Sequence, residues 1–119
     1  MNVEQLGSGK SYVLYAVVEN GKCLVKEFID SLTPANQGQI ISLINRILEN
    51  GPPRNEEKFR HLGDKIYELK TRSGVRILVF FGGRKSLVLT HGFFKVASKK
   101  LQREKDKAVA WYKEYHNIT

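Results

Sequence analysis

The sequence predicts a small α+β fold: an antiparallel-rich sheet with two N-terminal helices on one face and a C-terminal helix, in the order β-α-α-β-β-β-α. Three strand-like segments joined by short Gly-containing turns lie between residues 66 and 94, which predicts an antiparallel meander. Apolar residues recur at helical spacing both before and after this run. With 119 residues, the chain has room for one hydrophobic core and hence one domain.

The first strand is expected after a polar N-terminal segment. Residues 1–11 are polar and rich in Gly, which predicts a flexible N-terminal extension and leaves residues 12–119 as the single domain. Residues 12–19 are rich in aromatic and β-branched residues and predict a strand, which a turn at Asn20–Gly21 closes.

Two helices are expected next. A stripe at positions i, i+3, i+4 and i+7 predicts the first, through Val25, Phe28, Ile29 and Leu32. Thr33 is a suitable N-cap and Pro34 a suitable first residue for the second helix, which Gly51 ends. The predicted apolar stripe of this second helix is Ile40, Ile41, Ile44, Ile47 and Leu48.

The meander follows a charged segment, residues 54–64, which lacks periodicity and predicts a loop. The predicted strands are Ile66–Thr71, Val75–Phe81 and Ser86–Phe94. Turns are expected at Ser73–Gly74 and Gly82–Gly83.

A final helix can be capped by Ser98. Its predicted apolar face consists of Leu101, Ala108, Trp111, Tyr112 and Tyr115. Because the two earlier helices are expected to cover one face of the sheet, the other face is predicted to be an open basic groove.

Positive charge is concentrated in the second half of the chain. Residues 1–50 hold 4 Lys and Arg against 5 Asp and Glu, whereas residues 51–119 hold 16 against 7. This asymmetry favours a polyanionic partner, with a merely soluble basic surface as the alternative. Cys23 is the only cysteine, and the sequence shows neither a signal peptide nor an apolar run of about 20 residues, so a reducing cytoplasm and no membrane association are expected.

Three short blocks in the meander carry a family resemblance. They are Tyr67-Glu68-Leu69-Lys70, Arg76 with Phe80 four residues on, and His91-Gly92-Phe93-Phe94-Lys95 followed by Lys99. In this order the blocks resemble HigB-type toxins of the phage-derived branch, within the RelE superfamily of ribosome-associated mRNA endonucleases. The resemblance covers residues 12–115. The chain has Lys70 where Arg is usual, Val96 where a second Lys is usual, and Leu101 where Pro is common.

The resemblance implies a RelE-like fold and a type II toxin that cleaves mRNA on the ribosome and so inhibits translation. It also implies a cognate helix-turn-helix antitoxin as partner, with operator DNA bound only through the antitoxin complex. The RNA 2′-hydroxyl is the nucleophile in such a reaction, so the chemistry needs no metal and no cofactor. Side chains must move two protons and stabilise the charge on the phosphorane.

Four residues are the predicted catalytic group. Arg76 offers a planar fork for phosphate, although a strand-end Arg can also extend to solvent, and Lys70 is expected to hold phosphate beside it. His91 can act as acid or base, or can be a hydrogen-bonded histidine at the edge of the core. Lys95 can act as base or as a phosphate contact.

Strand alternation places His91 on one face with Leu87, Leu89, Phe93 and Lys95. The predicted RNA contacts are Arg72, Phe93, Lys99 and Tyr67. The alternative for Phe93 is an ordinary position in the core. The alternative for Arg72 and Lys99 is that they are simply solvated. Tyr67 and His61 could also substitute in proton transfer, and Glu68 is expected to pair with a neighbouring cation.

Two other functions are compatible with the sequence. One is a non-catalytic module that binds RNA, or acts within a DNA-binding complex, with the same fold; Lys70 and Val96 raise this alternative. The other is a structural protein of a phage or prophage, which would assemble with itself.

Overall fold

The computed structural model describes residues 1–117, and the last two residues of the predicted domain 12–119 lie outside the described part. The elements are β1 (Asn2–Ser8), β2 (Val13–Glu19), β3 (Lys22–Cys23), α1 (Leu24–Asp30), α2 (Pro34–Asn50), β4 (Phe59–Gly63), β5 (Ile66–Lys70), β6 (Val75–Gly83), β7 (Ser86–Phe94) and α3 (Ser98–Tyr115). The strand order is β1-β2-β7-β6-β5-β4, with β3 beside β2. The β2–β7 pair is parallel and the other pairs are antiparallel, so the predicted α+β class is confirmed.

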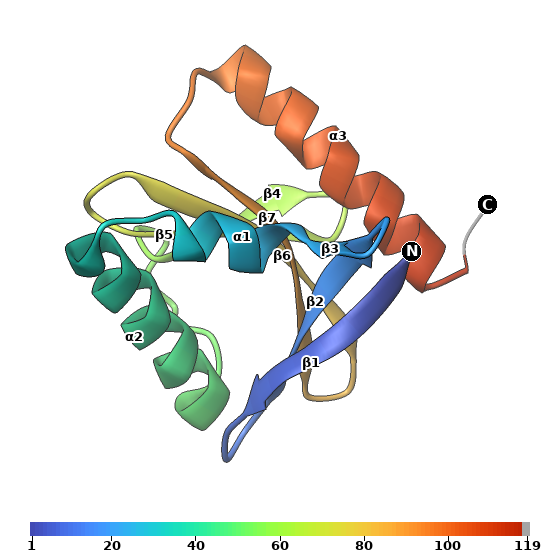
Figure 1. Ribbon diagram of the computed structural model, residues 1–119, viewed down its shortest axis with the longest axis horizontal. Helices are drawn as coiled ribbons and strands as arrows, with labels where there is room; N and C mark the ends of the chain where they lie inside the picture. The colour runs from blue at the N-terminus through green and yellow to red at the C-terminus, as the bar shows by residue number, and fades with distance from the viewer. Residues whose placement is uncertain (118–119) are drawn as a thin grey trace.

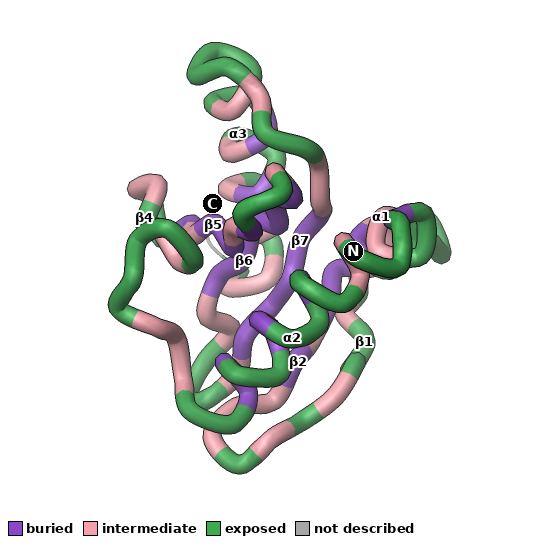
Figure 2. Tube along the Cα trace, turned by 90° about the vertical axis from the view of Figure 1, so that its left-hand side faces the viewer, coloured by how far each residue is buried: buried purple, intermediate pink, exposed green. Residues whose placement is uncertain are grey.

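The sheet separates two hydrophobic cores (Figure 1). Ile40, Ile44 and Ile47 of α2 and Val25 of α1 pack with Leu87 and Leu89 of β7 in the first core. In the second, Ala108 of α3 packs with Leu78 and Phe80 of β6. Figure 2 shows the central strands as the main buried region between the helices. The prediction of an open groove on the second face is therefore wrong, because the aromatic stripe of α3 covers much of that face.

The second helix starts and ends as predicted. Thr33 Oγ1 accepts a hydrogen bond from the Asn36 amide at 3.3 Å, and Gly51 ends the helix with φ 82°. The predicted apolar stripe is wrong at one position. Ile41 is 44% exposed, and Leu43 is buried instead. The reason is geometric, because Leu43 lies three residues from Ile40 on the same face, whereas Ile41 is turned about 100° away.

Three strands were not predicted: β1 and β4 at the edges of the sheet, and the two-residue β3 beside β2. Asn2–Ser8 form β1, so the prediction of a flexible extension over residues 1–11 is wrong; the pairing comes from backbone hydrogen bonds to β2, which polar residues make equally well. Likewise, Phe59–Gly63 form β4 inside the predicted loop 54–64. An edge strand exposes much of its surface, so its sequence lacks the apolar alternation that identifies a strand.

Two local boundaries also differ. The β6–β7 turn is Arg84–Lys85, with Lys85 at φ 59°, because Gly82 and Gly83 continue the strand. Ala97, not Ser98, is the N-cap of α3, and its side chain makes no capping hydrogen bond.

A β-bulge in β7 changes which residues face α3. Val79 pairs with Leu89 and Ile77 pairs with Gly92, so β7 contains one extra residue over this interval. As a result, Leu87 and Leu89 lie in the first core, whereas His91 and Phe93 face α3. The predicted shared face of His91 with the two leucines is wrong, because strict alternation fails at a bulge.

Glycine at position 92 permits the contact between α1 and β7. A Cβ added there would meet the ring of Phe28, whereas one added at Gly38 in α2 would meet nothing within 4 Å. We expect Gly92→Ala to lower the free energy of unfolding by about 1–3 kcal/mol and Gly38→Ala to raise it by about 0.5–1 kcal/mol. Urea unfolding measures both. Wild-type stability of Gly92→Ala would contradict the described packing of Phe28.

Candidate active site

Strand register brings three of the predicted site residues side by side. Lys70 of β5 pairs with Arg76 of β6, and Arg76 pairs with Phe93 of β7. Arg76 alternates with Leu78 and Phe80, which pack against α3, so this row lies on the α3 face of the sheet. The row is at the end of β6 away from the Arg84–Lys85 turn.

Arg76 is held in place from several directions. Its Nη1 donates to the carbonyl oxygens of Thr71 at 2.9 Å and Val75 at 3.0 Å, and its Nε lies 3.9 Å from Glu68 Oε2. The residue is only 8% exposed, so it does not extend to solvent as the alternative interpretation required. A guanidinium fixed in this way is preorganised to bind an anion.

Glu68 is the buried carboxylate of this cluster. It is 1% exposed, and its Oε1 accepts from Arg60 Nη2 at 2.9 Å while its Oε2 faces Arg76. The prediction that Glu68 pairs with a neighbouring cation is confirmed. Since Glu68 is shared by two guanidinium groups, it positions Arg76 without cancelling the positive charge of the cluster.

His91 is enclosed between the sheet and α3. The Thr90 Oγ1 atom lies 3.0 Å from the Leu78 carbonyl oxygen, to which it donates, and 2.9 Å from His91 Nδ1. His91 Nε2 lies 3.3 Å from Glu104 Oε1, which Lys107 Nζ also holds at 2.9 Å. Burial lowers the pKa of His91, although the Glu104 carboxylate opposes this effect. The enclosed ring therefore matches the hydrogen-bonded alternative for His91.

The free energy of unfolding should decrease in acid because of the His91–Glu104 pair. The pKa of His91 is lower in the folded state than its ordinary value of 6.5, so below about pH 6.5 the unfolded chain binds more protons and unfolding becomes easier. Burial alone would raise the pKa of Glu104, but Lys107 and His91 hold it below 4.5, which extends the loss below about pH 4.5. We expect a lower urea midpoint at pH 5.5 than at pH 7.5.

The control for the pH effect is His91→Gln, which cannot titrate. We expect its urea midpoints at pH 5.5 and pH 7.5 to differ less than those of the wild type. An equal difference in both proteins would show that another group causes the acid sensitivity.

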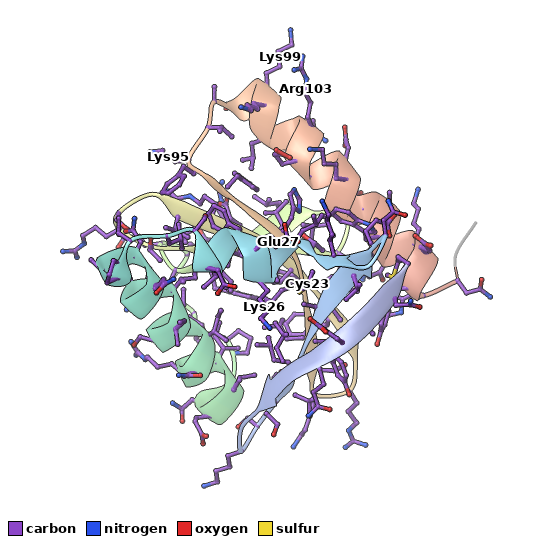
Figure 3. All side chains as sticks on the ribbon, viewed as in Figure 1. Cys23, Lys26, Glu27, Lys95, Lys99 and Arg103 are labelled. Atoms are coloured by element: carbon purple, nitrogen blue, oxygen red, sulfur yellow. The ribbon has the colours of Figure 1, made fainter. Side chains whose placement is uncertain are left out.

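The other predicted cations, Lys95, Arg72 and Lys99, lie near the end of β6 that begins with Val75 and Arg76. The Lys95 amide donates to the Gly74 carbonyl at 2.8 Å, which places Lys95 beside the turn that contains Arg72. Both side chains are exposed. Lys99 is in the first turn of α3, and Figure 3 shows it with Arg103 at that helix end, pointing away from the molecule. Lys95 is therefore close to the Arg76 row, whereas Lys99 is at its periphery.

Tyr67 does not join this group. It packs against the first core, on the opposite face of the sheet from Arg76. Its ring stacks between Phe59, at a centroid distance of 5.0 Å, and His61, at 4.6 Å. The one-residue offset from Glu68 accounts for this, because successive residues of a strand point to opposite faces.

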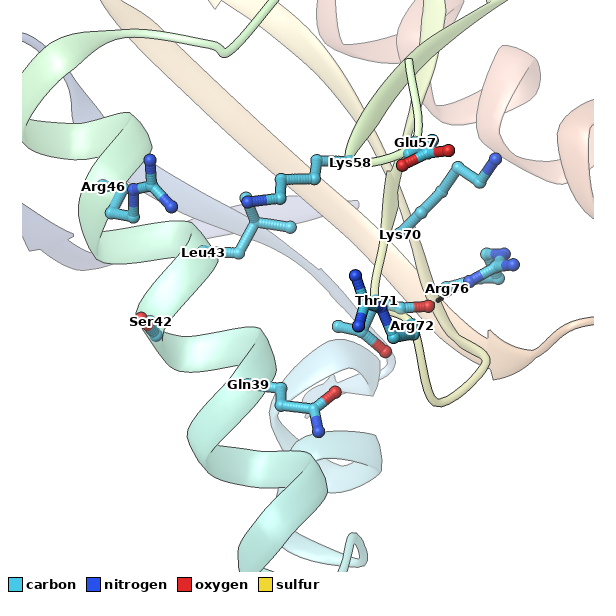
Figure 4. A pocket seen from close by; sticks show the side chains of 10 residues that line it. All are labelled: Gln39, Ser42, Leu43, Arg46, Glu57, Lys58, Lys70, Thr71, Arg72 and Arg76. Carbon is cyan, nitrogen blue, oxygen red and sulfur yellow. Dashed lines mark hydrogen bonds between the residues drawn. The ribbon is translucent and has the colours of Figure 1, made fainter. Parts of the chain in front are cut away.

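A pocket of about 540 Å³ lies where α2 meets the end of β5 (Figure 4). Its lining residues are Gln39, Ser42, Leu43, Arg46, Glu57, Lys58, Lys70, Thr71, Arg72 and Arg76. Arg46 and Lys58 were not predicted, because nothing local distinguishes them from solvated charges. Glu104 was also missed, although a carboxylate three residues after Leu101 and four before Ala108, on an apolar face, was a usable signal.

The fold and this basic cluster define a class of small α+β protein suited to an anionic ligand. A family model, Phage derived protein Gp49-like (DUF891), matches residues 27–113. The chain belongs to this family, which is part of the RelE/toxin–antitoxin-like superfamily and so implies an antitoxin partner. No curated protein matches the chain. Within residues 1–117, no helix is long and apolar enough to cross a membrane.

Proposed function

We propose that this protein is the toxin of a type II toxin–antitoxin system, of the HigB branch, and that it cleaves mRNA on the ribosome without a metal. The observation that carries the proposal is the buried, preorganised guanidinium of Arg76 beside Lys70 and Phe93. A planar guanidinium fixed in this way matches the charge and geometry of a phosphodiester. Membership of a toxin–antitoxin-related family supports the same conclusion.

In the proposed reaction, a base removes the proton of the RNA 2′-hydroxyl as the 2′-oxygen attacks phosphorus. The bond from phosphorus to the 5′-oxygen breaks, and an acid protonates the departing 5′-oxygen. The products are a 2′,3′-cyclic phosphate and a 5′-hydroxyl. Arg76 and Lys70 stabilise the charge that builds on the phosphorane oxygens. Lys95 is exposed beside the row and is better placed for proton transfer than His91, whose nitrogens face Thr90 and Glu104. Phe93 is available to stack on a base.

The ribosome supplies orientation in this proposal. Few acid–base groups are exposed at the site, and positioning of the RNA alone can contribute about 7–11 kcal/mol to catalysis. The proposed regulator is a helix-turn-helix antitoxin, whose complex with the toxin would bind operator DNA. With these partners, the proposed location of the protein is the cytoplasm.

The test is to incubate the protein with an mRNA on programmed ribosomes, and with the same mRNA alone in EDTA, and then to map the new RNA ends. We expect 5′-hydroxyl ends that form on ribosomes and much more slowly without them. Binding of RNA by a folded protein that produces no cleavage in either mixture would instead support the non-catalytic module.

A further inference from the structure

The pocket of about 540 Å³ extends the basic cluster around the end of β5 to the α2 side of the sheet. Three of its cations come from separate segments: Arg46 from α2, Lys58 from the loop before β4, and Arg72 from the β5–β6 turn. Within residues 1–117, none of the three has a carboxylate oxygen within 4.0 Å. Their charges are therefore available to an external anion.

A chain of hydrogen bonds ties the two walls of the pocket together. Ser73 Oγ donates to Gln39 Oε1 of α2 at 3.0 Å and lies 3.1 Å from Thr71 Oγ1, which accepts from the Val75 amide at 3.1 Å. This chain sets the separation between α2 and the β5–β6 turn. The two segments that form the pocket walls are thus linked by a side-chain hydrogen bond.

The pocket and the Arg76 row share one wall. The Thr71 carbonyl, whose residue lines the pocket, accepts from Arg76 Nη1 at 2.9 Å. Figure 4 shows the side chains of Lys70 and Arg76 pointing away from α2, whereas Lys58 points toward α2 and Arg46. Positive charge therefore continues from the α3 face of the sheet, around the end of β5, to the α2 side.

We propose that this pocket binds backbone phosphates of the same RNA strand, next to the bond that is cleaved. This inference rests on the proposed function, since it deepens the description of the same substrate. Cations in a continuous path match the repeated charges of a nucleic-acid backbone. Gln39 and Ser42 add neutral donors for phosphate or ribose oxygens.

The experiment measures binding, so that it does not depend on cleavage. The probes are RNA oligonucleotides of three and nine nucleotides with 2′-O-methyl groups, which remove the nucleophile. The test variant is Arg46→Ala/Lys58→Ala. The matched control is Lys10→Ala/Lys22→Ala, which removes the same charge from two exposed residues, Lys10 after β1 and Lys22 in β3. Thermal unfolding checks that both variants are folded.

We expect the test variant to bind the nine-nucleotide RNA about tenfold more weakly and the three-nucleotide RNA as the wild type does. The slope of log affinity against log salt should decrease in magnitude by about 1.4, from two contacts of about 0.7 each on a single strand. The control should change neither the length dependence nor the slope by a comparable amount.

Four results would overturn the subsite. Two concern the RNA probes: equal losses on both RNA lengths, and equal losses in the control. The other two are a loss seen only in binding to ribosomes, which would assign the pocket to ribosomal RNA, and a loss seen only with an acidic antitoxin peptide. If the wild type cleaves mRNA but one of these results is found, only the subsite fails. If length-dependent binding is found without any cleavage, the subsite stands and the endonuclease proposal fails.

Discussion

Replacing Arg76 by Ala is expected to lower the rate of mRNA cleavage on ribosomes by about 10²–10³-fold, the usual effect of removing one preorganised group that stabilises transition-state charge. Arg76 is positioned before substrate binds, by two backbone carbonyls and by Glu68. Little reorganisation is then needed as charge builds on the phosphorane. The measurement is the single-turnover cleavage rate on programmed ribosomes.

Arg84→Ala is the matched control, because Arg84 is an exposed Arg at the opposite end of the same strand hairpin. We expect it to keep the wild-type rate within about twofold, as surface changes usually do. Arg76→Lys should recover only part of the lost rate, since a lysine keeps the charge but not the planar fork. A cleavage rate of Arg76→Ala equal to that of Arg84→Ala would remove Arg76 from the catalytic group.

Replacing Glu68 by Ala should lower the free energy of unfolding by about 3 kcal/mol, because removing one partner of a buried ion pair leaves the other charge uncompensated. The remaining charge is mainly that of Arg76, whose side chain is 10% exposed, whereas the Arg60 side chain is 40% exposed and can turn to water. Urea unfolding at pH 7.5 measures the change.

Glu57→Ala is the control for Glu68→Ala. Glu57 is an exposed carboxylate near the same end of the sheet, so its loss should change stability by less than about 0.5 kcal/mol. We also expect Glu68→Ala to slow cleavage, because Arg76 loses the group that faces its Nε. Unfolding free energies that are equal for the two variants would show that Glu68 makes no net contribution to the fold.

Much of the fold was predictable because its signals are local. The stripe of α2, its Thr33 cap and the strands of the meander depend on residues a few positions apart, and the structure contains them with small changes at the ends. The edge strands β1 and β4 were not predictable in this way. Their pairing depends on β2 and β5, and their exposed or half-buried side chains carry no clear pattern.

The candidate site was predictable in type and only partly in arrangement. The sequence by itself determined that Lys70 and Arg76 lie near strand ends, and it predicted a polyanion as the ligand. Charge and strand alternation can be read from residues that are close together in the chain. Only the tertiary structure decided that Tyr67 lies across the sheet, that the bulge turns His91 toward Glu104, and that Arg46 and Lys58 complete a pocket. These outcomes depend on strand register and on contacts between segments far apart in the chain, which no local pattern specifies.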